Sequence, residues 1–279
     1  MTTSTAPRAP RPHGVLPRLA TTAALALTVV GTAVGVGAFG GTPVQGAGGG
    51  LLSADATPLA PAGGAFSIWS LIYLGLAAYT IVQWWDPTDR HRIRVAAILS
   101  MLLNALWILV VQAGMLSLSV LVIVVLLTVL AVIVRRLTAS APRGPVEAVA
   151  LHGTFGLYLG WVCVATCANI AAALLGAGFR GFSTTGAGSP GPLAVGVVIV
   201  AAAVGTGLAL SGRRSAGAVA PLAAVLAVGW GLAWIAVGRL AGEPASALVG
   251  GAAAVAAAGV VIAGITTAQE RIRAIRNAS

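Results

Sequence analysis

Apolar residues run through the chain in eight long stretches that short polar segments separate. Most stretches contain roughly 20 residues, which as an α-helix cross about 30 Å of hydrocarbon. They lie at about 19–40, 64–85, 94–113, 115–136, 147–175, 192–211, 217–237 and 245–267. An open sheet cannot satisfy its backbone in lipid, so we predict that all eight are helical. The pattern therefore predicts an all-α integral membrane protein with eight spans.

The first stretch, 19–40, has two interpretations. Basic residues precede it and small residues follow it, as in a secretory signal peptide. Its apolar run is longer than the core of a typical signal peptide, which favours a helix that is retained in the protein.

Composition supports a membrane protein and leaves no segment for a soluble domain. Apolar residues make up 58% of the chain and charged residues 8%, far from the soluble norm. The net charge of +10 does not indicate a nucleic-acid partner, because the basic residues lie in short loops rather than on a continuous polar surface. All of them are arginine, which together with much alanine, glycine and valine indicates a GC-rich bacterial source.

The arginines alternate between the two sides of the membrane. One set of loops holds Arg8, Arg11, Arg18, Arg90, Arg92, Arg94, Arg135, Arg136, Arg143, Arg213, Arg214, Arg271, Arg273 and Arg276. The opposite loops hold only Arg180 and Arg239. Because basic loops face the cytoplasm, this asymmetry predicts an even number of spans in the bacterial inner membrane, with both termini cytoplasmic.

Two linkers rich in glycine and proline divide the chain further. Residues 41–63 form an external loop after the first span, and residues 176–191 form an external linker after the fifth. We therefore predict five segments. They are a cytoplasmic tail (1–18), a five-helix core (19–175), the linker (176–191), three additional helices (192–267) and a second cytoplasmic tail (268–279).

Acidic and catalytic signals are sparse. The six acidic residues, Asp55, Asp86, Asp89, Glu147, Glu243 and Glu270, all fall in loops or at span ends. Ion-coupled pumps usually place a carboxylate within the membrane, so coupled transport is disfavoured. The chain shows no phosphate-binding glycine motif, zinc pattern or nucleophile elbow. We expect a protein that is not an enzyme, with no catalytic or metal-ligating residue.

Five other residues invite a chemical role, but the structural interpretation is favoured for each. Cys163 and Cys167 lie one helical turn apart within an apolar span and are interpreted as small core residues. His152 could ligate a haem iron, although a lone histidine is more often a hydrogen-bonded interface residue. Trp230 and Trp234 are interpreted as packing residues.

Three spans carry tryptophan, tyrosine and asparagine at helical spacing. The motifs are Phe66-x2-Trp69-x3-Tyr73, Asn104-x2-Trp107 and Tyr158-x2-Trp161-x3-Ala165-x3-Asn169. Each motif occupies one helix face, so the three faces can enclose an apolar cavity with a few polar groups, as small-molecule sites do. In the alternative interpretation the asparagines only hydrogen-bond across helices and the tryptophans only mark the bilayer interfaces.

In order and spacing, these motifs resemble the tryptophan-rich sensory protein family, whose mitochondrial members are called translocator proteins. The resemblance implies a five-helix bundle, here over about 19–175, that can form a homodimer. It also implies a pocket under the first loop that binds porphyrins or haem as ligand, with no other cofactor. By motif, the ligand-binding residues would be Phe66, Trp69, Tyr73, Asn104, Trp107, Tyr158, Trp161, Ala165 and Asn169.

The chain also departs from the family pattern. The family's Pro-Pro-x-Trp in the first loop is here Pro61-Ala62-Gly63-Gly64, and no Tyr-x-Arg arrangement follows Asn169, which argues against a sterol ligand. We therefore expect a receptor or transporter for a flat hydrophobic molecule of the porphyrin type. The alternatives are an uncoupled permease that uses all eight helices and a membrane scaffold that binds no ligand.

Overall fold

A computed structural model describes residues 14–35, 37–38, 43–44, 46–85, 89–182 and 191–278. Its long helices are α1 (Val15–Gly35), α2 (Ile68–Trp85), α3 (Arg94–Gln112), α4 (Leu116–Thr138), α6 (Thr154–Gly176), α7 (Gly191–Arg214), α8 (Val219–Leu240) and α9 (Ala247–Ala278). The short elements are η1 (Ala47–Gly50), η2 (Gly63–Ser67), α5 (Pro145–Glu147), the π-helical turn η3 (Ala148–Gly153) and η4 (Arg180–Phe182). Eight helical segments are long and apolar enough to cross a membrane, which confirms the predicted all-α fold with eight spans.

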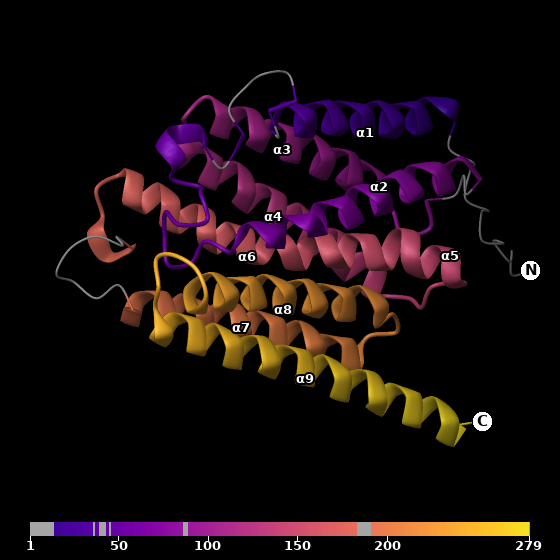
Figure 1. Cartoon of the computed structure of the whole chain (residues 1–279). Coiled ribbons are helices and arrows are strands. Elements are labelled where there is room, and N and C mark those ends of the chain that lie inside the picture. Colours follow the sequence, from indigo (N-terminus) through magenta and orange to yellow (C-terminus); the bar gives the residue numbers. More distant parts are fainter. Residues whose placement is uncertain are drawn as a thin grey trace, which may run out of the picture.

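The long helices lie side by side in one elongated bundle (Figure 1). α1 packs on α3 at one edge, α6 and α8 pack on each other at the centre, and α7 and α9 form the other edge. α6 carries three of the largest fully buried side chains, Phe155, Tyr158 and Trp161. One buried apolar cluster joins α6 to α2, α3 and α4, and a second joins it to α7, α8 and α9.

Close contact between α6 and α8 depends on two glycines. A Cβ atom at Gly156 would lie 2.3 Å from the Ala220 carbonyl oxygen, and one at Gly160 would lie 2.1 Å from that of Ala224. Small residues at one face let two membrane helices approach until their backbones touch. The last three helices are thereby packed directly on the aromatic-bearing helix.

The first helix is built into the bundle in a similar way. The Thr28 hydroxyl donates to the Met101 carbonyl of α3 at 2.8 Å, and Thr28 is fully buried. Gly31 faces Ala105, where an added Cβ would lie 3.2 Å from the alanine methyl group. This packing favours the interpretation of the first stretch as a retained helix.

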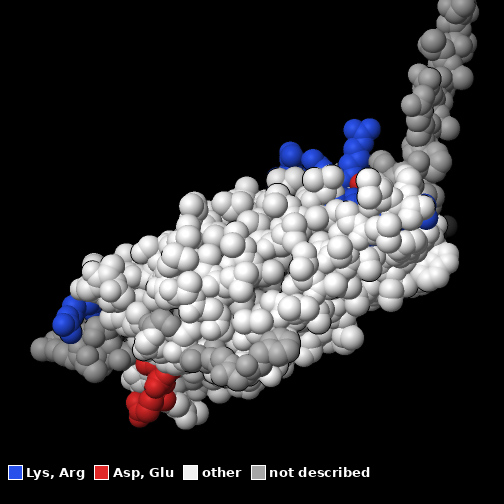
Figure 2. All heavy atoms as spheres, turned by 90° about the horizontal axis from the view of Figure 1, so that it is seen from above, with Lys and Arg blue, Asp and Glu red and all other residues white. Residues whose placement is uncertain are grey.

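The two ends of the bundle differ in charge. Figure 2 shows arginines gathered mainly toward one end of the visible face, with an acidic group and a smaller basic group at the other end and an uncharged belt between them. We call the end at which α1 begins and α9 finishes the arginine-rich end (Figure 1). An uncharged belt between polar ends is what a bilayer requires of a spanning bundle.

Helix boundaries agree with the apolar pattern except at the two ends of the chain. α1 begins at Val15 and stops at Gly35, and α9 continues to Ala278, through most of the segment expected to be a tail. The extension is held because the Arg271 guanidinium donates to the carbonyls of Ser215, at 2.7 Å, and Ala216, at 3.1 Å, just beyond α7. Residues 183–190 of the predicted 176–191 linker lie outside the described residues.

Candidate functional site

A cavity of about 490 Å³ lies between the helices that carry the three motifs, α2, α3 and α6. Its remaining walls come from α1, α4 and the loop that joins α1 to α2. The lining comprises Thr32, Gly35, Pro43, Val44, Leu51, Leu52, Thr57, Ala60, Pro61, Phe66, Trp69, Ser70, Tyr73, Asn104, Trp107, Ile108, Ile123, Leu126, Trp161, Val162, Ala165, Ala168 and Asn169. The volume falls in the range typical of small-molecule sites, about 300–1,000 Å³.

Four aromatic side chains form a continuous wall. Trp69 stacks on Tyr73, one turn along α2, with ring centroids 5.3 Å apart. Trp161 of α6 meets the ring of Trp69 edge to face at 6.4 Å and that of Phe66 at 5.6 Å. Stacked and edge-to-face rings fix one another's orientation, so the wall is rigid as well as apolar.

One polar group in the cavity, the Tyr73 hydroxyl, joins three helices. It accepts a hydrogen bond from the Thr32 hydroxyl of α1 at 2.5 Å and one from the Asn104 side-chain amide of α3 at 2.9 Å. Because Tyr73 belongs to α2, these two bonds fix the relative positions of α1, α2 and α3.

A second polar group centres on Asn169 of α6. Its side-chain carbonyl accepts from the Trp107 indole N–H of α3 at 3.1 Å, and its amide nitrogen donates to the Ser119 hydroxyl of α4 at 2.9 Å. Asn169 is 1% exposed, so both bonds are shielded from water. Both predicted asparagines thus line the cavity and also lock helices together.

Eight of the nine residues predicted from the motifs line the cavity, and Tyr158 does not. Tyr158 is fully buried behind Trp69, whose ring it meets edge to face at 5.8 Å. Its hydroxyl donates to the Ser100 carbonyl of α3 at 3.3 Å. Tyr158 lies on the same face of α6 as Trp161, one helical turn away and beyond the end of the cavity. It therefore packs against the outer side of the aromatic wall.

The loop between α1 and α2 covers the cavity and is held by α8. Its residue Ala62 donates its backbone N–H to the Trp234 carbonyl at 3.1 Å, and the Trp230 indole donates to the Ala65 carbonyl at 2.9 Å. The Trp234 ring fills the space above Gly64, where an added Cβ would lie 2.2 Å from it. Trp230 and Trp234, interpreted from the sequence as packing residues, therefore hold the loop that covers the cavity.

Arg239 of α8 makes the strongest contact with this loop. Its guanidinium donates to the carbonyls of Ala54, at 2.6 Å, and Thr57, at 3.2 Å, while its side chain is almost fully buried. Nearby, hydrogen bonding by the Ser53 hydroxyl and the charge of Arg239 lower the pKa of the Asp55 carboxyl. The loop carbonyls thus receive a charge-assisted hydrogen bond, roughly twice as strong as a neutral one.

The other residues singled out by sequence lie away from the cavity lining. Cys163 and Cys167 are free thiols, partly buried in α6. His152 was interpreted as a hydrogen-bonded interface residue, which is wrong: it is fully buried, and neither ring nitrogen has a hydrogen-bond partner among the described residues. Trp230 lines a smaller cavity of about 190 Å³ between α2, α6 and α8.

Several lining residues carried no signal in the sequence. The loop residues Leu51, Leu52 and Ala60 are apolar residues among many, and the pattern of spans does not show where a loop folds back. Ser119 lies outside the lining and bonds to Asn169 from α4; serine hydroxyls often bond across membrane helices, so a partner of this kind could have been expected. Arg239 could also have been found, as one of only two arginines on its side.

A bundle of spanning helices around an aromatic cavity defines a multi-pass membrane protein. The model of one protein family, described as TSPO-like protein, matches residues 19–266. The chain therefore belongs to the TSPO-like family, and the match includes the last three helices. A comparison with the curated proteins finds no significant match, and neither does a comparison with the solved structures.

Proposed function

We propose that this protein binds a flat hydrophobic molecule of the porphyrin type in the cavity, as a receptor or transporter in a bacterial inner membrane. The observation that carries the proposal is the wall formed by Phe66, Trp69, Tyr73 and Trp161 beneath a loop that is itself held in place. Aromatic faces suit a planar conjugated ligand, and a pre-formed cavity avoids the cost of ordering the site. Asn104 and Asn169 would orient the ligand or hold the helices around it.

Binding is favoured over catalysis by the chemistry of the lining. Its side chains are apolar, aromatic, hydroxyl or amide groups, and among the described residues none is a carboxylate, imidazole or thiol. General acid–base catalysis most often uses groups of those kinds, and the hydroxyl of Tyr73, the phenol in the lining, is already bonded to Thr32 and Asn104. The positions of the arginines support an orientation with both termini in the cytoplasm. That the protein forms a homodimer stays a prediction.

A permease that used all eight helices would need a path between the five-helix core and the last three helices. These two parts meet at the seam between α6 and α8. The backbones of the two helices touch at Gly156 and Gly160, which leaves no room for a solute at that level. The cavity instead lies on the other side of α6. This arrangement supports a binding site within the core rather than a path that uses all eight helices.

Titration of the detergent-purified protein with protoporphyrin IX tests the proposal. Binding is read from the absorption band of the porphyrin, so that loss of a tryptophan does not change the reporter. We expect saturable binding, weakened about 5- to 30-fold in Trp161→Phe, since one stacking contact contributes about 1–2 kcal/mol. Trp85→Phe is the matched control, because Trp85 is 77% exposed at the end of α2.

Two other results of the porphyrin titration would be informative. Folded protein that shows no saturable binding would contradict the proposal and favour a scaffold in which the motifs only hold the bundle together. Equal affinities for wild type and Trp161→Phe would place the bound porphyrin outside the cavity.

A further inference from the structure

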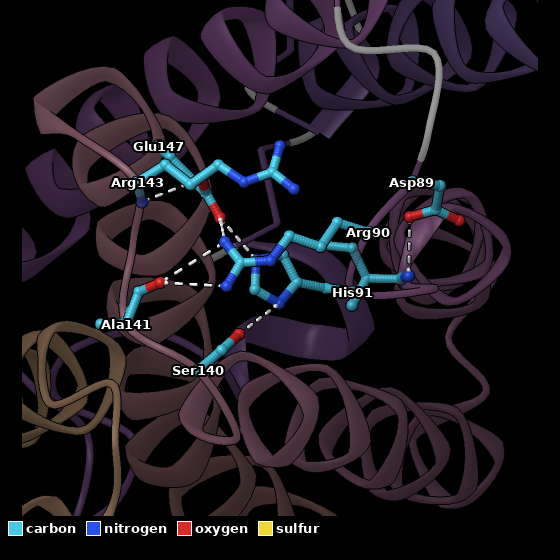
Figure 3. Close-up of polar contacts among 8 residues, drawn as sticks. Asp89, Arg90, His91, Ser140, Ala141, Arg143 and Glu147 are labelled. Carbon is cyan, nitrogen blue, oxygen red and sulfur yellow. Dashed lines mark hydrogen bonds and ion pairs between the residues drawn. The ribbon is translucent and has the colours of Figure 1, made fainter. Parts of the chain in front are cut away.

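Two histidines and a glutamate come together at the arginine-rich end, away from the cavity. His91 lies between α2 and α3, Glu147 ends α5, and His152 belongs to η3. One ligand atom from each of the three lies within 4.8 Å of the other two. Figure 3 shows the imidazole of His91 directed at the Glu147 carboxylate, which it meets at 2.5 Å.

The π-helical turn is what brings Glu147 and His152 together. Residues five apart in an α-helix point about 140° away from each other, so these two side chains would face different neighbours. In a π-helix the hydrogen bonds run between residues five apart, and such residues lie nearly above one another. The Thr154 N–H bonds to the Val149 carbonyl in this way. Single π-turns within α-helices occur frequently at functional sites.

His152 supplies a second, independent observation. It is fully buried, and neither its Nδ1 nor its Nε2 has a hydrogen-bond partner in the described part of the chain. Its ring stands edge to face against that of His91, with centroids 5.5 Å apart. A buried imidazole with no partner loses the hydrogen bonds that water would give it, which is costly. Such a cost is expected where the group has a ligand to bind.

We propose that His91, Glu147 and His152 bind a divalent transition-metal ion of the Zn²⁺ class. Two imidazoles and one carboxylate are a common ligand set for such ions and leave a further position for water. Tetrahedral bonds of 2.0–2.1 Å place ligand atoms about 3.3 Å apart. The contact between His91 and Glu147, at 2.5 Å, is shorter than this separation, and the limit within which all three ligand atoms lie, 4.8 Å, is longer. Rotations of the side chains therefore suffice to bring the ligand atoms to the tetrahedral separation.

Residues around the three ligands hold them in place. The Arg143 backbone N–H donates to Glu147 Oε2 at 3.1 Å, and the Ser140 hydroxyl lies 3.5 Å from Nδ1 of His91. Such outer contacts orient metal ligands and raise affinity. Arg90 opposes a cation, because its guanidinium lies 3.3 Å from Glu147 Oε1; when the ion binds, Arg90 retains its bonds to the Ala141 carbonyl (Figure 3).

Zinc retention by the full-length protein tests the site. The protein is purified in detergent through a tag without histidines, stripped with a chelator, loaded with Zn²⁺ and desalted, and the bound metal is measured by mass spectrometry. We expect one equivalent of zinc and a rise in thermal stability on loading. His91→Ala and Glu147→Gln should each lose at least tenfold in zinc affinity, because each removes an atom that binds the metal directly.

The chain offers matched controls for both residue types. It contains three histidines, so His13→Ala tests the one outside the cluster, and Glu270→Gln tests an exposed carboxylate paired with Arg213. Both should retain the zinc. His152 is buried and its substitution can disturb folding, so X-ray absorption of the zinc-loaded wild type provides the third readout, with scattering from two imidazoles expected.

The proposal is overturned by wild-type protein that retains no zinc. It is equally overturned by full retention in His91→Ala, or by an absorption spectrum without imidazole scattering. Porphyrin binding is not measured in any of these experiments, so their result is independent of the function proposed for the cavity.

Discussion

Asn169 combines contact with the cavity and contact between helices in a single side chain. It joins α6 to Trp107 of α3 and to Ser119 of α4, and it is almost fully buried. A side chain with this many bonds in an apolar setting contributes to stability whether or not a ligand binds.

We expect Asn169→Ala to lower the free energy of unfolding by about 1–2 kcal/mol. The substitution leaves the Trp107 N–H and the Ser119 hydroxyl without their partner in an apolar environment. Thermal unfolding in detergent can be followed with a thiol-reactive dye, since Cys163 and Cys167 are free and partly buried. Asn277→Ala, at an exposed position near the end of α9, is the control and should leave the transition unchanged.

At single residues, sequence reasoning located the polar and aromatic walls better than the rest of the site. Tryptophan and asparagine are conspicuous in apolar spans, and a helical period tells which of them share a face. Tyr158 shows where this fails, because the period gives the face but not the depth at which the cavity ends. The interpretation of His152 rests on residue type alone, and nothing in the apolar pattern indicates the π-turn that places it beside Glu147.

Between elements, the contact of α6 with α8 depends on the absence of side chains. We expect Gly160→Ala to destabilise the protein by about 1–3 kcal/mol, because the new methyl group would overlap the Ala224 backbone, which cannot move without shifting α8. Gly196→Ala in α7 is matched to it, since a Cβ there meets nothing within 4 Å. Equal unfolding temperatures for the two variants would contradict this account of the seam.

Arg239 of α8 holds the first loop over the cavity, so we expect its substitution to make the ligand dissociate faster. Arg239→Gln loses the charge-assisted bonds to the carbonyls of Ala54 and Thr57. A loss of about 1–1.4 kcal/mol corresponds to a 5- to 10-fold faster dissociation of protoporphyrin IX in stopped-flow experiments. Arg180→Gln, at an exposed position beyond α6, should dissociate at the wild-type rate.

Over the whole molecule, the distribution of arginines predicts orientation in the membrane. A green fluorescent protein fused at the C-terminus should fluoresce, because it matures in the cytoplasm, and alkaline phosphatase fused there should be inactive. Phosphatase inserted within residues 183–190 should be active, since that segment follows α6 on the side with few arginines. Activity of the C-terminal phosphatase fusion would reverse the orientation.

The number and order of the spans could be predicted at this scale, because eight apolar stretches and alternating arginines constrain each other. The division into a core and three additional helices is a weaker prediction. Apolar patterning shows that a helix is buried but not which neighbour buries it, so the docking of α8 on α6 and on the first loop was not foreseen.

The attachment of the first loop to α8 has a consequence in terms of linkage. A ligand that binds only beneath the attached loop favours the state in which α8 holds that loop, and α8 in turn raises the affinity for the ligand by the same factor. This reciprocity requires no movement of the cavity wall. It makes the three C-terminal helices a place where a second binding event, even one far from the cavity, would change how tightly the first ligand is held.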